Sequence, residues 1–92
     1  MANKLLVFRV HAIQRMAQRG ITVEDVRHVL DAGEVIEDYP NDFPYPSALV
    51  LGWKGRQAIH VVAATTPLER IVITVYEPDL TRWEPDLKRR KP

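Results

Sequence analysis

The sequence predicts an α+β domain in which two N-terminal helices pack on an antiparallel sheet of three to four strands. Apolar residues recur at helical spacing in the first third of the chain, and alternating apolar runs separated by turn residues follow. A chain of 92 residues can build one hydrophobic core but is too short for two ordinary domains. We therefore treat residues 1–92 as a single domain.

Residues 10–19 have the pattern of an amphipathic helix. Spaced at about 100° per residue, its apolar side gathers Val10, Ile13, Met16 and Ala17. Its polar side gathers His11, Gln14, Arg15, Gln18 and Arg19. Gly20 follows the last periodic residue, where a glycine commonly ends a helix. Residues 1–9 precede this helix as an N-terminal segment.

A second helix is predicted from Thr22 to about Ala32. Thr22 is the N-cap, and Glu24 and Asp25 place acids in the first turn, where they complement the helix dipole. Gly33 ends this helix. Its apolar arc consists of Val23, Val26, Val29 and Leu30.

The remaining chain favours strands, because β-branched and aromatic residues alternate between turn residues. The predicted strands are Val35–Tyr39, Ala48–Trp53, Gln57–Ala64 and Ile71–Tyr76. The proline-rich stretch Pro40–Pro46 is a loop, and Lys54–Arg56 forms the tip of a hairpin. In the irregular segment that follows, Trp83 is expected to pack back on the domain, and residues 86–92 to form a flexible basic tail.

Strand register places three polar side chains on one face of the predicted sheet. Pairing the wholly apolar faces of the last two strands requires odd-numbered residues to meet odd-numbered ones, because a slip of one residue inverts a face. His60, Thr74 and Tyr76 then share the opposite face. A face that mixes polar and apolar groups suits the floor of a cleft.

Charges are unevenly distributed along a chain whose formal net charge is only +1. This near-neutral balance argues against a domain that coats nucleic acid non-specifically. Residues 1–20 hold four basic residues and no acid, whereas residues 21–46 hold seven acids and one base. Basic ends around an acidic middle can steer a polyanion to one side or dock an oppositely patterned protein.

Composition also indicates the compartment and the cofactors. The chain has no cysteine, and the apolar run Leu5–Phe8 is too short for a signal peptide or a membrane span. We therefore expect a cytoplasmic protein without membrane contact. The three histidines lack metal-ligand spacing and the four glycines form no phosphate-binding loop, so we expect neither a metal nor a cofactor.

Two histidines and two arginines have side chains suited to RNA cleavage. Attack by the RNA's own 2′-hydroxyl requires a proton acceptor, a proton donor and cations near phosphorus, but no metal. His11 and His60 are the candidates for the proton roles, because histidine titrates near working pH. Arg15 and Arg19 present forked donors that match phosphate oxygens.

Tyr76 and Thr74 complete the candidate site: Tyr76 can support a base or the leaving group, and Thr74 can contact the substrate. Simpler interpretations stand beside this one. The polar side of an amphipathic helix is usually just solvent-exposed, as we expect for His28, and a strand histidine is usually a core residue with one hydrogen bond. The alternative function is a non-catalytic module that binds a protein or a nucleic acid.

Several short motifs occur in a recognisable order along the chain. They are His11-Ala12, Arg15-Met16, Arg19-Gly20-Ile21, Gly33-Glu34-Val35-Ile36, Tyr39-Pro40, Leu51-Gly52, His60-Val61-Val62, Thr74-Val75-Tyr76-Glu77-Pro78 and Trp83. Together they resemble a small bacterial family labelled a domain of unknown function and grouped with the RelE, ParE and BrnT toxins. The resemblance covers residues 11–83.

This resemblance implies a RelE-like fold and the toxin of a type II toxin–antitoxin pair. Such a toxin cleaves RNA, including mRNA on the ribosome, or otherwise inhibits translation, and its protein partner is a cognate antitoxin. Carried over by position, the polar motif residues of the family are His11, Arg15, His60, Thr74 and Tyr76. The resemblance leaves the oligomeric state open.

Overall fold

The computed structural model describes residues 4–92, so residues 1–3 of the predicted N-terminal segment lie outside the described residues. In chain order the elements are β1 (Leu5–Phe8), α1 (Val10–Arg19), α2 (Val23–Ala32), β2 (Glu34–Tyr39), β3 (Ser47–Lys54), β4 (Gln57–Thr65) and β5 (Glu69–Tyr76). Neither described helix is long and apolar enough to cross a membrane.

The sheet is mixed and five-stranded, with the order β1-β5-β4-β3-β2, so the predicted antiparallel sheet of three to four strands is wrong. The additional strand is β1, which pairs in parallel with β5 from Leu5 opposite Glu69 to Phe8 opposite Val72. This segment was not predicted as a strand because it is only four residues long. Its parallel partner is distant in sequence, and no hairpin turn marks the pairing.

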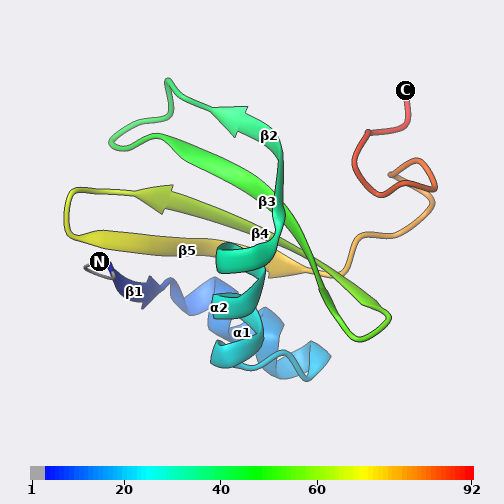
Figure 1. Cartoon of the computed structure of the whole chain (residues 1–92), viewed down its shortest axis with the longest axis horizontal. Helices are drawn as coiled ribbons and strands as arrows, with labels where there is room; N and C mark the ends of the chain where they lie inside the picture. Colours follow the sequence, from blue (N-terminus) through cyan, green and yellow to red (C-terminus); the bar gives the residue numbers. More distant parts are fainter. Residues whose placement is uncertain (1–3) are drawn as a thin grey trace.

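The two faces of the sheet are covered by different parts of the chain. Both helices lie on one face, while the segment after β5 leads away toward the other side (Figure 1). The hydrophobic core lies between helices and sheet and consists of Ala12, Met16, Ile21, Val26, Val29, Leu30, Val50, Ile59, Val61, Ala63, Val72 and Val75. The second face carries His60 and Tyr76, against which the C-terminal segment, residues 77–92, packs.

Helix α1 is rotated relative to the prediction from its periodicity. Ala12 and Met16 are buried, whereas Val10 is 70% and Ile13 52% exposed, and Ala17 is also exposed. The small side chain of Ala12 faces the core and allows the helix to approach the sheet closely. This rotation turns the arginines of α1 toward the edge of β5.

Helix α2 begins as predicted and buries three of its four predicted apolar residues. The Thr22 hydroxyl accepts a hydrogen bond from the Asp25 N–H, and the Asp25 carboxylate accepts one from the Thr22 N–H, which together form a capping box. Three members of the predicted apolar arc, Val26, Val29 and Leu30, are buried. Val23 is exposed, because it lies in the first turn at the edge of the interface.

Strands β4 and β5 have the predicted register near the candidate site. His60 lies opposite Tyr76 and Val62 opposite Thr74, so the predicted common face of His60, Thr74 and Tyr76 is confirmed.

Further along, β5 departs from simple alternation. The register shifts after Val62, because Ala63 pairs with Val72 and leaves Ile73 as an extra residue. As a result, Val72 and Val75 both point into the core, although the alternation predicts opposite faces.

The C-terminal segment contacts the sheet, although the sequence predicts a flexible basic tail for residues 86–92. Lys88 forms an ion pair with Glu34 at 2.9 Å, and Arg90 forms one with Glu37 at 2.8 Å. Trp83, which is only 3% exposed, packs back on the domain as predicted. Lys88 and Arg90 of the tail thus have partners on β2 that lie far away in the sequence, whereas Arg89 pairs with the nearby Asp86.

The close approach of α2 to β3 gives a first test of this packing. A Cβ atom added at Gly33 would lie 2.4 Å from the Val29 carbonyl oxygen and 2.6 Å from that of Leu51. We predict that Gly33→Ala lowers the free energy of unfolding by about 1–3 kcal/mol in denaturant titrations. Gly55→Asn is the control, because no atom lies within 4 Å of a Cβ there. Equal losses in both variants would contradict the packing.

Candidate functional site

A cleft of about 440 Å³ lies where α1, the end of β5 and the C-terminal segment meet. We call it the arginine cleft, and its lining consists of Arg15, Arg19, Thr74, Tyr76, Glu77, Asp79, Arg82, Trp83 and Arg90. Strand β1 pairs with β5 only as far as Val72, so the cleft opens at the part of β5 that β1 leaves uncovered. Four of the predicted site residues, Arg15, Arg19, Thr74 and Tyr76, come together here.

His11 is not among the residues that line the cleft. It is exposed on α1 next to the buried Ala12, and the helix turns Arg15 and Arg19 to the cleft instead. The polar stripe that the sequence predicts is therefore divided, with its arginines at the cleft and its histidine outside. His28 is exposed as predicted.

His60 is fully buried behind Tyr76, with 0% of its surface exposed. Its Nε2 lies 2.8 Å from the Leu87 carbonyl oxygen, and its Nδ1 lies 3.1 Å from the Tyr76 hydroxyl. A carbonyl oxygen can only accept a hydrogen bond, so Nε2 carries a proton and donates it to Leu87. In the neutral ring Nδ1 is then an acceptor, and the Tyr76 O–H donates to it.

Burial is the main influence on the ionisation of this pair. It lowers the pKa of His60 below its usual value, although the hydrogen bond to Leu87 and the charge of Glu37 act in the opposite direction. Burial also raises the pKa of Tyr76. Both changes favour a neutral histidine beside a neutral tyrosine.

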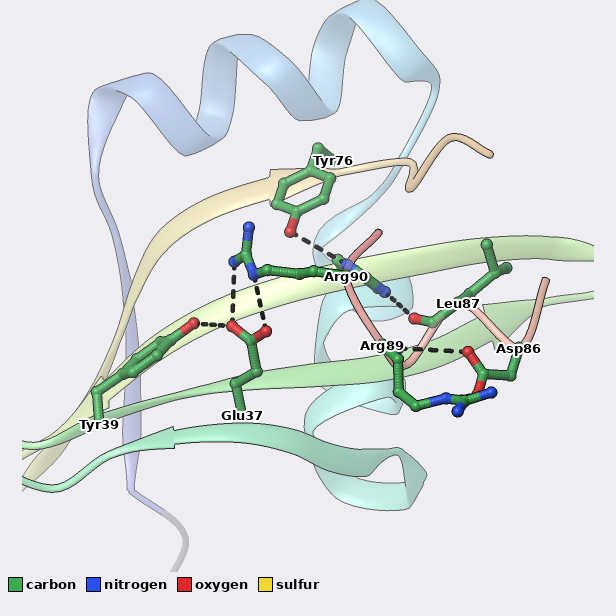
Figure 2. A network of polar contacts seen from close by, with 8 residues as sticks. Glu37, Tyr39, Tyr76, Asp86, Leu87, Arg89 and Arg90 are labelled. Carbon is green, nitrogen blue, oxygen red and sulfur yellow. Dashed lines mark hydrogen bonds and ion pairs between the residues drawn. The ribbon is translucent and has the colours of Figure 1, made fainter. Parts of the chain in front are cut away.

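A second polar network lies beside this pair and fixes Arg90 (Figure 2). The Arg90 guanidinium donates two hydrogen bonds to the Glu37 carboxylate, at 2.8 and 3.0 Å, and Tyr39 donates a third to the same group. The hydrogen bonds from Arg90 hold the pKa of Glu37 below its usual value. Arg90 also lies 4.7 Å from the centre of the Trp83 ring, a cation–π contact.

The cleft carries more positive than negative charge. Its lining has four arginines but only two carboxylates, those of Glu77 and Asp79. Arg19 lies 3.8 Å from Glu77 in a loose ion pair. Within residues 4–92, Arg15 and Arg82 form no ion pair, so their guanidinium groups are available to a ligand.

Two cleft arginines, Arg82 and Arg90, were not predicted. Arg82 directly precedes Trp83, which the sequence predicts to pack on the domain. A position for Arg82 close to the sheet could have been predicted from this. Arg90 belongs to the predicted flexible tail, and only the fold brings it to Glu37.

The acidic middle of the chain has partners within the domain. Asp25 pairs with Lys54, and Asp31 with Arg70. On β2, Glu34 and Glu37 pair with basic residues of the C-terminal segment. The uneven charge distribution in the sequence is thus largely matched inside the fold, with the arginine cleft as an exception.

Comparison with known proteins identifies the family. Residues 8–77 match the family described as Domain of unknown function (DUF4258), and the chain belongs to this family. No curated protein and no solved structure matches the chain. The matched region ends at Glu77, so it includes Arg15, Arg19, Thr74 and Tyr76 but not the arginines of the C-terminal segment.

The buried neutral histidine predicts how stability depends on pH. Below about pH 6.5 the unfolded chain takes up a proton that buried His60 resists. We predict that the free energy of unfolding falls as pH decreases from this value, by at most about 1.4 kcal/mol per pH unit, until folded His60 is protonated. Denaturant titrations between pH 5 and 8 measure this slope.

Two histidine variants separate this effect from other titrations. His60→Gln should flatten the slope, whereas His28→Gln, at an exposed position, should retain it. The same slope in His60→Gln as in the parent protein would show that another group is responsible.

Proposed function

We propose that this protein binds RNA in the arginine cleft and cleaves it as a metal-independent endoribonuclease. The observation that carries the proposal is the convergence of arginines from α1 and the C-terminal segment on Tyr76. A guanidinium group offers forked donors to phosphate oxygens, and several such groups around one opening suit a polyanion rather than a single anion.

RNA is favoured over other phosphate-bearing ligands by the chemistry available in the cleft. RNA carries its own nucleophile, the 2′-hydroxyl, and water can protonate the leaving oxygen, so the protein has to supply a proton acceptor and stabilisation of charge on phosphorus. Tyr76 and the arginines Arg15 and Arg82 provide groups for these two tasks. DNA lacks the 2′-hydroxyl and would bind without being cleaved.

The grouping of the resembled family with the RelE, ParE and BrnT toxins extends this proposal to the cell. Cleavage of cytoplasmic RNA, including mRNA on the ribosome, would stop translation and growth. A cognate antitoxin protein would then be needed to neutralise the activity.

The second candidate function is a non-catalytic binding module. It is favoured by the positions of the two predicted catalytic histidines, because His60 is fully buried and His11 lies outside the cleft. A module of this kind would use the same arginines to hold RNA but would leave it intact.

Binding to single-stranded RNA tests the role of the cleft. We predict that Arg15→Gln and Arg82→Gln each weaken affinity about tenfold at low salt, because each removes a charged donor to phosphate. The dependence of log affinity on log salt should become shallower by about 0.7 for each phosphate that a variant no longer neutralises. Fluorescence anisotropy with a labelled oligoribonucleotide measures both quantities.

Arg56→Gln is the matched control, because Arg56 lies at the β3–β4 turn and does not line the cleft. Its affinity for RNA should equal that of the parent protein. If Arg56→Gln weakened binding as much as the cleft variants, the attraction would come from overall charge, and the cleft would lose its assigned role.

Expression in bacteria tests the toxin part of the proposal. Induced expression of the chain alone should arrest growth, and co-expression of the adjacent gene should relieve the arrest. Arg15→Gln should weaken the arrest and Arg56→Gln should not. Normal growth of cells that contain the folded parent protein would refute the toxin assignment.

A further inference from the structure

The contacts of His60 determine the direction of one hydrogen bond at the edge of the cleft. Nε2 donates to the Leu87 carbonyl at 2.8 Å, so Nδ1 is left to accept from the Tyr76 hydroxyl at 3.1 Å. The phenolic proton of Tyr76 therefore points inward to the buried ring. The phenolic oxygen then keeps lone pairs that can accept a proton from a ligand, and Tyr76 is one of the residues that line the cleft.

We propose that Tyr76 is the catalytic residue that accepts the proton of the RNA 2′-hydroxyl, with His60 as the positioning residue that takes up the phenolic proton. This inference rests on the proposed RNA cleavage. It also gives the buried histidine a role that does not require contact with the substrate.

The proton transfers balance without a further reagent. The 2′-hydroxyl gives its proton to the Tyr76 oxygen while the Tyr76 proton moves to Nδ1 of His60. The 2′-oxygen forms a bond to phosphorus, and the bond from phosphorus to the 5′-oxygen breaks. The leaving 5′-oxygen takes a proton from water, and His60 returns its proton through Tyr76 to the resulting hydroxide. The products are a 2′,3′-cyclic phosphate and a 5′-hydroxyl.

The Leu87 backbone supports this assignment of the His60 proton. Leu87 has φ of 60°, in the left-handed region that non-glycine residues rarely adopt. Its N–H donates to the Glu84 carbonyl at 2.8 Å, which closes the turn that presents the Leu87 carbonyl to His60. The acceptor is thus held by a specific, unfavourable backbone conformation rather than by a mobile chain end.

The groups around His60 act on its protonated form in opposite ways. The carboxylate of Glu37 on β2 favours the imidazolium, whereas Arg90 of the C-terminal segment disfavours it. Tyr39 and Tyr76 are neutral neighbours of this cluster, because burial raises the pKa of each. The imidazolium formed during the reaction would keep its hydrogen bond to Leu87 and gain the attraction of Glu37.

Cleavage of a labelled oligoribonucleotide by the full chain tests the proposal. We expect Tyr76→Phe to reduce cleavage at least about 100-fold, a typical general-base effect, while RNA affinity changes less than about twofold. The parent protein should release a 2′,3′-cyclic phosphate and should leave a substrate with a 2′-deoxy cleavage site intact. Unchanged cleavage by Tyr76→Phe would overturn the catalytic assignment.

The pH profile distinguishes proton uptake by His60 from a purely structural role. In the parent protein kcat/KM should fall as pH decreases through the pKa of His60, which burial places below the usual 6.5. His60→Asn keeps an acceptor near the Nδ1 position but has no basic nitrogen, so this decline should disappear along with most of the activity. His28→Gln should retain the parent profile. Retention of the decline in His60→Asn would overturn the role of His60.

Nitrogen NMR of the histidine ring tests the geometry without RNA. We expect neutral His60 to carry its proton on Nε2, and a proton on Nδ1 would overturn the inference. If the protein has the expected tautomer and binds RNA but cleaves none, the inference fails and the binding-module alternative stands. If it binds no RNA at all, the proposed function itself fails, and the inference fails with it.

Discussion

The hydrogen bond from His60 to the Leu87 carbonyl is the interaction on which the candidate site depends. It joins the C-terminal segment to the middle of the sheet and fixes which ring nitrogen faces Tyr76. If the Nε2 proton had no acceptor at this fully buried position, the free energy of unfolding would be lower by about 1–3 kcal/mol. The histidine therefore holds the segment that supplies Arg82 and Arg90 to the cleft.

Other contacts of the C-terminal segment add less to its attachment. Lys88 pairs with Glu34 on β2, but these side chains are 45% and 58% exposed, and exposed ion pairs contribute little. The stronger contribution comes from Trp83, whose ring packs edge-on against His60 with centroids 4.5 Å apart. Buried aromatic packing and one buried hydrogen bond thus attach the segment, while the two hydrogen bonds from Arg90 to Glu37 fix that arginine.

The sequence predicted the parts of this structure that depend on local pattern. Both helices, their termini, the last four strands and the shared face of His60, Thr74 and Tyr76 followed from periodicity and turn residues. Strand β1 was missed because its parallel pairing with β5 is a contact between distant segments. The same reason applies to Arg90, whose partner Glu37 is 53 residues away. The rotation of α1 was also missed, because the helix buries the small Ala12 while the more hydrophobic Val10 and Ile13 are exposed. A pattern based on side-chain hydrophobicity predicts the reverse.

The central proposal is that RNA binds at the arginine cleft, which Tyr76 helps to line, rather than elsewhere on the domain. NMR titration of the isotopically labelled chain with a single-stranded oligoribonucleotide tests this most directly. We predict that the amide signals of Arg15, Thr74, Tyr76 and Arg82 shift together with one affinity, while those around His28 and Trp53, which line a separate pocket, stay in place. Shifts confined to the His28 and Trp53 pocket, or no shifts at all, would contradict it.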